Sequence, residues 1–239
     1  MKKGEIMRSD LSAYPKSCSE EAYFRFVDAL SALHTTDGLV DAAIAVSLHA
    51  LDDVDPQWVR EDIAALAERV RRRVRNPTNN ALLAHLHEVL FEEEGFVGNN
   101  QHERFALGSY LPAVLATRSG LPILLSLLYK AVGDQVGLQV EGVNAPNHFL
   151  VRVVTDEGPA IVDPFFGGAL LSREEAFRRL KQVSARPVPR NDLLLRPASH
   201  SQWIGRIIAN LVAVFAADNR LDDLAAMLEL RQALEETLL

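Results

Sequence analysis

The stretch from Leu121 to Val136 most constrains the fold, because apolar residues cover almost the whole circumference of the helix that it predicts. A helix that is apolar nearly all round must be buried on several sides, so we expect it at the centre of the molecule. Pro122 suits the first turn of this helix, and Gly137 suits the residue after its end. Its apolar residues are Ile123, Leu124, Leu125, Leu127, Leu128, Val132 and Val136.

Strand patterns follow this helix directly. Leu138, Val140 and Val143 indicate a first strand, residues 149–154 a second and residues 160–163 a third. The segment Asp156-Glu157-Gly158 is typical of a hairpin turn, which makes the second and third strands antiparallel neighbours.

Helices are predicted on both sides of this block. The pattern is helical from Glu20 to about Phe91, with Asp55-Pro56 as a helix start, Asn76-Pro77 as a break and Gly95 as a stop. Residues 96–105 predict a loop, and a short helix follows around residues 110–115. Further helices are predicted over about 172–181, 202–217 and 221–238, with a connection rich in Pro and Arg before the last two.

His148 and Asp163 flank the predicted hairpin at similar distances from its turn. On neighbouring antiparallel strands, such residues come within hydrogen-bonding reach. An Asp that accepts from one imidazole nitrogen would fix the tautomer and leave the other nitrogen as a base. The alternative is a pair that only ties two strands together, and the residues alone leave both interpretations open.

Several motifs carry a resemblance to a known family. They include Gly120-Leu121-Pro122-Ile123, Val136-Gly137-Leu138, Glu141-Gly142-Val143, Pro146-Asn147-His148-Phe149-Leu150, Val162-Asp163-Pro164-Phe165 and, upstream and downstream, Glu94-Gly95-Phe96, Gly98-Asn99 and Asn210-Leu211. With these motifs the chain resembles, over most of residues 30–239, the transglutaminase-like family named after the SirB invasion regulator.

The resemblance implies an α+β fold with a papain-like, transglutaminase-like core, in which a buried helix packs on a small antiparallel sheet. Active members carry a Cys at the start of the buried helix, where the helix N-terminus lowers the thiol pKa and a His on the sheet pairs with the thiolate. Counted from Gly137, that position falls on Pro122. His148 and Asp163 match the family His and Asp, so the resemblance implies the remnant of a catalytic dyad without its nucleophile.

Other residues are weak substitutes for the nucleophile. Cys18, the single cysteine, lies far from the helix start and is a tail or small-hydrophobe cysteine. Ser119 lies three residues before the required position, and Ser126 lies one turn inside the helix, where its hydroxyl favours a backbone carbonyl. We nevertheless expect Ser119, Asn147 and Asn99 as binding residues, although Asn99 could equally make a turn.

No metal or cofactor is expected, since no phosphate loop is present and His85 and His87 cannot share one helix face. The 239 residues carry a net charge of -7, which argues against nucleic acid as a partner. The basic run over residues 70–75 is most simply the C-terminal end of a helix. No signal peptide or apolar stretch long enough to span a membrane is seen, so we expect a cytoplasmic protein.

The predicted organisation has five parts. They are a flexible tail (1–19), an N-terminal helical region (20–117), the transglutaminase-like core (118–182), a connection (183–199) and a C-terminal helical hairpin of tetratricopeptide-like type (200–239). The leading hypothesis is a non-catalytic binding or regulatory module for an unidentified protein or peptide. The alternatives are a hydrolase that uses the His148-Asp163 dyad with water or a displaced serine, and a structural scaffold without a cleft.

Overall fold

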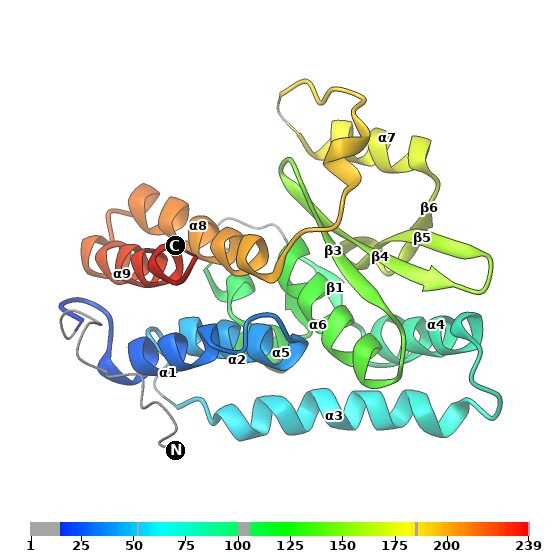
Figure 1. Cartoon of the computed structure of the whole chain (residues 1–239), viewed down its shortest axis with the longest axis horizontal. Coiled ribbons are helices and arrows are strands. Elements are labelled where there is room, and N and C mark those ends of the chain that lie inside the picture. Colours follow the sequence, from blue (N-terminus) through cyan, green and yellow to red (C-terminus); the bar gives the residue numbers. More distant parts are fainter. Residues whose placement is uncertain (1–14, 52, 100–105, 185, 239) are drawn as a thin grey trace, which may run out of the picture.

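Helix α6 (Pro122–Gln135) lies at the centre of the molecule, as the sequence predicts (Figure 1). The computed structural model describes residues 15–51, 53–99, 106–184 and 186–238. Eleven of the fourteen residues of α6, from Ile123 to Gly133, are buried. Even Lys130 is buried, because its ammonium group donates to the Asp134 carboxylate and to the Val140 carbonyl, both at 2.7 Å.

A four-stranded antiparallel sheet packs against this helix. Its strands are β3 (Val140–Ala145), β4 (His148–Thr155), β5 (Gly158–Asp163) and β6 (Ala169–Leu171), in that order. The fold is therefore α+β, as expected. Strand β6 was not predicted, because three residues are too few to show an alternating pattern.

Both faces of the sheet are covered. Phe149, Val151 and Val153 of β4 belong to the main core around α6. Leu150 points the other way, into a second core that it shares with Phe177 and Leu180 of helix α7 (Arg173–Val183). Burial on both faces explains why residues 149–154 are apolar at every position except Arg152, instead of alternating between apolar and polar.

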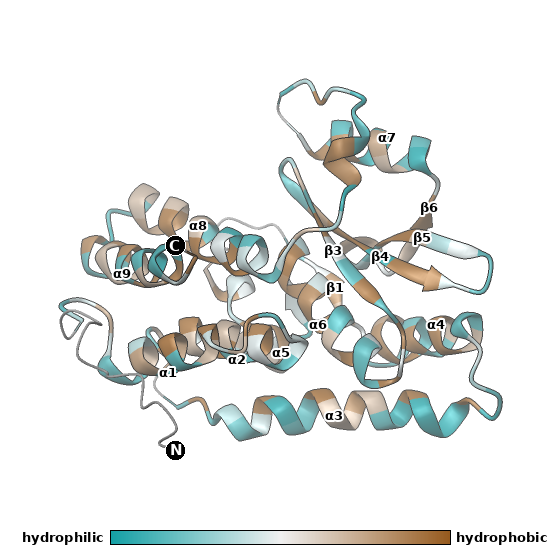
Figure 2. Ribbon diagram, viewed as in Figure 1, coloured by the Kyte–Doolittle hydropathy of each residue, from teal (hydrophilic) through white to brown (hydrophobic). Residues whose placement is uncertain are grey.

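The N-terminal helices lie below and beside α6, and they are α1 (Glu20–Leu30), α2 (Thr36–Ser47), α3 (Pro56–Arg73), α4 (Asn79–His87) and α5 (Leu111–Thr117). Helix α3 starts as predicted, with Asp55 accepting from the Gln57 amide and Pro56 in its first turn. Figure 2 shows a polar outer side along α3. A π-helical turn over Glu88–Glu93 continues α4.

Two very short strands were missed by the sequence analysis. Strand β1 (Val97–Gly98), inside the predicted loop, pairs in parallel with β2 (Ser119–Gly120), just before α6. A side chain at Gly98 would overlap the ring of Phe165. The glycine thus allows β1 to lie directly against the segment that follows β5.

The C-terminal helices α8 (His200–Ala217) and α9 (Leu221–Thr237) form an antiparallel pair that packs on the N-terminal helices (Figure 1). A 3₁₀ turn over Asp192–Leu195 lies in the connection before them. In the described part of the chain, no helix is long and apolar enough to cross a membrane.

The first described residues are held by α9. Residues 1–14 of the predicted tail lie outside the described residues. The backbone amides of Lys16, Ser17 and Cys18 donate to the Glu229 carboxylate, the last at 3.0 Å. Cys18 itself is buried in the main core, so of its two predicted roles the structure shows the small hydrophobe.

Candidate functional site

The imidazole of His148 and the carboxylate of Asp163 are in direct contact. Nε2 of His148 lies 3.0 Å from both carboxylate oxygens. The strand register explains the contact. Val151 of β4 pairs with Val162 of β5, so His148 and Asp163 lie near the same end of the sheet. Both side chains are almost completely buried, with His148 2% exposed and Asp163 0%. Asp163 thereby fixes the ring orientation and leaves Nδ1 as the second nitrogen.

Besides His148, Asp163 has a cationic neighbour that could not be identified from the sequence. Nη1 of Arg179, on α7, lies 3.4 Å from Oδ2 of Asp163. The same guanidinium lies over the ring of Phe166, 3.7 Å from its centroid. A buried carboxylate needs such compensation, because transfer of an unpaired charge out of water is costly.

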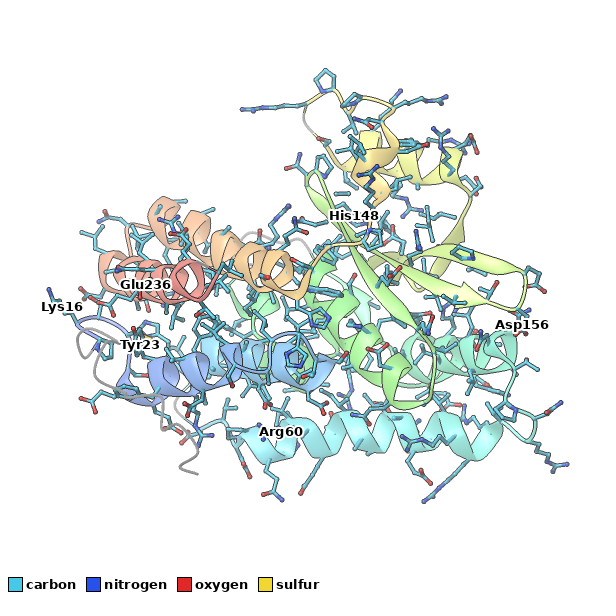
Figure 3. All side chains as sticks on the ribbon, viewed as in Figure 1. Lys16, Tyr23, Arg60, His148, Asp156 and Glu236 are labelled. Carbon is cyan, nitrogen blue, oxygen red and sulfur yellow. The ribbon has the colours of Figure 1, made fainter. Side chains whose placement is uncertain are left out.

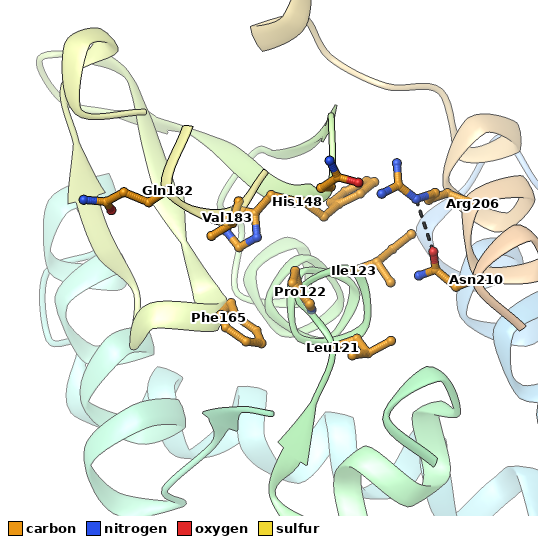
Figure 4. A pocket seen from close by; sticks show the side chains of 11 residues that line it. Leu121, Pro122, Ile123, His148, Phe165, Gln182, Val183, Arg206 and Asn210 are labelled. Carbon is orange, nitrogen blue, oxygen red and sulfur yellow. Dashed lines mark hydrogen bonds between the residues drawn. The ribbon is translucent and has the colours of Figure 1, made fainter. Parts of the chain in front are cut away.

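Pro122 occupies the first turn of α6, with Leu121 as the N-cap residue. Figure 4 shows Pro122 in the middle of a cavity, with His148 and Phe165 on one side of it. Pro122 and His148 thus border the same cavity, although they are 26 residues apart in the sequence and belong to a helix and a strand. Proline is well suited to the first turn of a helix, where no backbone donor is needed.

The cavity measures about 600 Å³ and lies at the end of the sheet where β4 begins. Figure 3 labels His148 at the sheet and Arg60 on α3, and of the two only His148 is buried. The described residues that line the cavity come from five segments: the start of α6, the β3–β4 turn with the start of β4, the turn after β5, the end of α7, and α8. These residues are Leu121, Pro122 and Ile123; Asn147, His148 and Phe149; Phe165; Gln182 and Val183; and Arg206 and Asn210.

Helix α8 forms the wall opposite the dyad. Its Trp203 donates Nε1–H to the Ile123 carbonyl at 3.3 Å and packs on Phe149 with ring centroids 4.6 Å apart. One turn later, Arg206 donates from Nε to Asn210 Oδ1 at 3.3 Å (Figure 4). Burial lowers the pKa of Arg206 from its ordinary value.

The predicted binding residues are not all in the cavity. Asn147 lines it, with a left-handed φ of 56° after Pro146, which is typical of a type II turn. Its side-chain amide donates to Ser184 Oγ at 2.7 Å. Ser119 belongs to β2, and Asn99 directly follows β1. The backbone N–H of Asn99 donates to the Gly120 carbonyl. Neither Asn99 nor Ser119 is among the described lining residues.

The other nucleophile candidates are placed elsewhere. Burial raises the pKa of the Cys18 thiol to about 12, so it is protonated and unreactive at neutral pH. Ser126 is buried inside α6, and its hydroxyl donates to the Phe149 carbonyl at 3.4 Å. The partner of this hydroxyl is thus a backbone carbonyl, which belongs to strand β4.

Other polar clusters have local partners. The Tyr129 hydroxyl and Nε2 of His87 are 2.8 Å apart, and burial lowers the pKa of His87 to about 4. Among the described residues, no three His, Cys, Asp or Glu side chains are grouped to hold a metal ion. In the basic run, Arg73 pairs with Glu88 and Glu93, and Arg72 pairs with Glu68.

Arg206, Asn210, Gln182 and Val183 were not predicted as site residues, although Asn210 belongs to a motif that carries the resemblance. A signal for the first two exists in the sequence. Arg206 and Asn210 are four residues apart on α8, where the neighbouring residues Ile204, Ile207, Ile208 and Leu211 are apolar and fully buried. Polar residues at that spacing share a helix face, and here they share the cavity wall.

Comparison with known proteins identifies a family and several relatives of this chain. A family model described as the transglutaminase-like superfamily matches residues 57–209. A UPF0162 protein of Xylella fastidiosa (strain 9a5c) is 32% identical over 188 residues, covering 77% of this chain and 67% of that protein. Mouse F-box only protein 21 is 42% identical over 77 residues, which are 32% of this chain and 12% of that protein.

A second bacterial relative is more distant. A UPF0162 protein of Vibrio cholerae is 24% identical over 131 residues, covering 54% of this chain and 48% of that protein. No solved structure gives a significant match. The family match spans α3 to α8 and includes the central helix, the sheet and all the described cavity-lining residues except Asn210. The chain belongs to the transglutaminase-like superfamily.

Proposed function

We propose that this chain is a non-catalytic transglutaminase-like protein that acts as a binding or regulatory module and holds a peptide or protein segment in the cavity beside Pro122 and His148. The observation that carries the proposal is the position of Pro122. It begins the buried helix and borders the same cavity as the dyad, and proline has no atom that could attack a substrate.

The rest of the cavity supports the same proposal. None of its described lining residues is a Ser, Thr, Cys or Lys. Its volume and its mostly apolar lining are typical of ligand-binding sites. A scaffold without a nucleophile loses covalent catalysis but keeps its shape, and shape is sufficient for binding.

The finer assignments are part of this proposal. We propose the SirB branch of the superfamily on the motifs around Gly120 and His148. The α8–α9 pair is proposed as a tetratricopeptide-like docking element, supported by its antiparallel packing and by the two side chains that α8 contributes to the cavity. A single buried thiol fits a reducing compartment, so we place the protein in the cytoplasm.

Selection from a peptide pool tests the binding function. The purified full chain is incubated with random acetylated hexapeptides, and the bound peptides are quantified by mass spectrometry. We expect the Val183→Trp variant, which fills the cavity, to retain far fewer peptides than the wild type. The control Leu193→Trp adds the same ring at an exposed position outside the cavity and should retain as many as the wild type. Equal retention by all three proteins contradicts the proposal.

One observation favours a second candidate, a hydrolase that activates water. The imidazole held by Asp163 borders a cavity large enough for a substrate, and this is the geometry of a general base. Turnover of amide or ester substrates by the wild type, lost in His148→Ala, would support this candidate and overturn the non-catalytic proposal. We expect no turnover by either protein.

A further inference from the structure

We infer that the segment bound in the cavity carries a carboxylate, and that Arg206 binds this carboxylate. The inference rests on the proposed binding function and adds the chemical class of the ligand. It starts from an arginine that faces the cavity without an acidic partner among the described residues.

The described partners of the Arg206 guanidinium are neutral. Nη1 donates to Asn144 Oδ1 at 3.0 Å, and Nε donates to Asn210 Oδ1 at 3.3 Å. These two amides hold the guanidinium in place, but they do not neutralise its charge. A guanidinium has five N–H donors, so the remaining donors are available to a ligand.

Most other arginines with described side-chain contacts are neutralised within the chain. Arg60 pairs with Asp41, Arg69 with Glu93 and Glu94, and Arg118 with Asp62 and Glu94. The same holds for Arg73, Arg173, Arg179 and Arg220. Arg206 differs from these arginines because it has no carboxylate partner among the described residues, and it lies at the wall of the cavity.

The cavity has no negative charge to offset Arg206. No Asp or Glu is among its described lining residues. The acid of the dyad, Asp163, is fully buried and already contacts His148 and Arg179. The chain as a whole has a net charge of -7, so this positive wall is a local feature.

The remaining lining favours a carboxylate on a peptide over a free inorganic anion. Leu121, Ile123, Phe149, Phe165 and Val183 provide apolar contacts beside the guanidinium. The planar fork of an arginine binds a carboxylate through two parallel hydrogen bonds. A C-terminal carboxylate and an Asp or Glu side chain share this chemistry, and the experiment distinguishes them.

The test uses four pools of acetylated random hexapeptides built from neutral residues. The first pool has a free C-terminal carboxylate, and the second has a C-terminal amide. The third is amidated and contains one Glu, and the fourth is amidated and contains one phosphoserine. The wild type, Arg206→Gln and Arg196→Gln are compared, since Arg196 is exposed and outside the cavity.

For the wild type, we expect about tenfold or greater retention of one carboxylate pool over the neutral amide pool, because hydrogen bonds between charged groups are the strong ones. Whichever of the first and third pools is enriched identifies the source of the carboxylate. Arg206→Gln should abolish the preference, and Arg196→Gln should keep it. The comparison of pools on the wild type alone does not depend on how well a variant folds.

Three results would overturn the inference. Equal retention of charged and neutral pools by the wild type leaves the binding function standing but removes the role of Arg206. Preference for the phosphoserine pool makes the ligand class wrong. Retention of no pool contradicts the binding function as well as the carboxylate inference.

Discussion

Asp163 shows how one buried residue depends on two others. Its carboxylate is fully buried, with His148 on one side and Arg179 on the other. The contact between His148 and Asp163 could be predicted from their spacing around the hairpin. Arg179 could not, because its helix reaches the pair only through the packing of α7 on the sheet.

The contribution of Arg179 can be measured with a neighbouring control. We expect Arg179→Gln to lower the free energy of unfolding by about 1–3 kcal/mol, because the buried carboxylate loses a cationic neighbour and Phe166 loses its stacked guanidinium. Arg178→Gln, one residue earlier and exposed, should change it by less than about 0.5 kcal/mol. Chemical denaturation of both variants checks the prediction, and equal losses would contradict it.

His87 makes stability depend on pH. Burial lowers its pKa to about 4 in the folded chain, against 6.5 as the ordinary value. Between these values the unfolded chain binds a proton that the folded chain does not, so stability is lost as the pH falls from about 6.5 towards 4. The slope from this one group approaches about 1.4 kcal/mol per pH unit.

The variant His87→Gln removes this titration but keeps an acceptor for the Tyr129 hydroxyl. Denaturation curves at several pH values should show that the variant loses less stability on acidification than the wild type. An identical pH dependence of the two proteins would show that His87 is not kept neutral by the fold.

At the scale of the elements, long regular segments were predictable and very short ones were not. Helix α6, the hairpin between β4 and β5, and the Asp55 cap of α3 all follow from local patterns. The β1–β2 pair and β6 have only two or three residues each, so periodicity cannot reveal them. Strand β1 pairs with β2, which directly precedes α6, and β6 pairs with β5 at the edge of the sheet.

The contact between α8 and β3 depends on a glycine. A Cβ atom at Gly142 would overlap the indole ring of Trp203, the side chain that attaches α8 to α6. We expect Gly142→Ala to destabilise the fold by about 1–3 kcal/mol through overpacking and to displace the wall that carries Arg206. Thermal denaturation measures the first effect, and peptide-pool retention measures the second.

Gly205 offers the matched control on α8. A Cβ atom there would lie 3.5 Å from Leu234 Cδ2, an ordinary contact distance. Because glycine weakens a helix interior, Gly205→Ala should stabilise the chain by about 0.5–1 kcal/mol. If both alanine variants were destabilised alike, the close approach of Trp203 to β3 would not be the cause.

At the scale of the whole molecule, the cavity exists because distant segments meet. Its walls come from the start of α6, the β3–β4 turn with the start of β4, the turn after β5, the end of α7 and the middle of α8. The resemblance to the transglutaminase-like family indicated Pro122 and His148 as neighbours, and Asn147 directly precedes His148 in the chain. Arg206 and Asn210 lie more than fifty residues later, and only the packing of α8 brings them to the site.

We propose that Pro122 occupies the nucleophile position of a transglutaminase-like site that keeps its His148–Asp163 pair. The most direct test is Pro122→Cys, followed by iodoacetamide alkylation at about pH 7, with the rate measured by mass spectrometry. The helix N-terminus and His148 should lower the pKa of the introduced thiol, so it should react about tenfold or more faster than in the double variant Pro122→Cys/His148→Ala. Cys18, kept protonated by burial, serves as the unreactive internal reference. An introduced thiol that reacts at the rate of an ordinary exposed cysteine, with or without His148, would contradict the account.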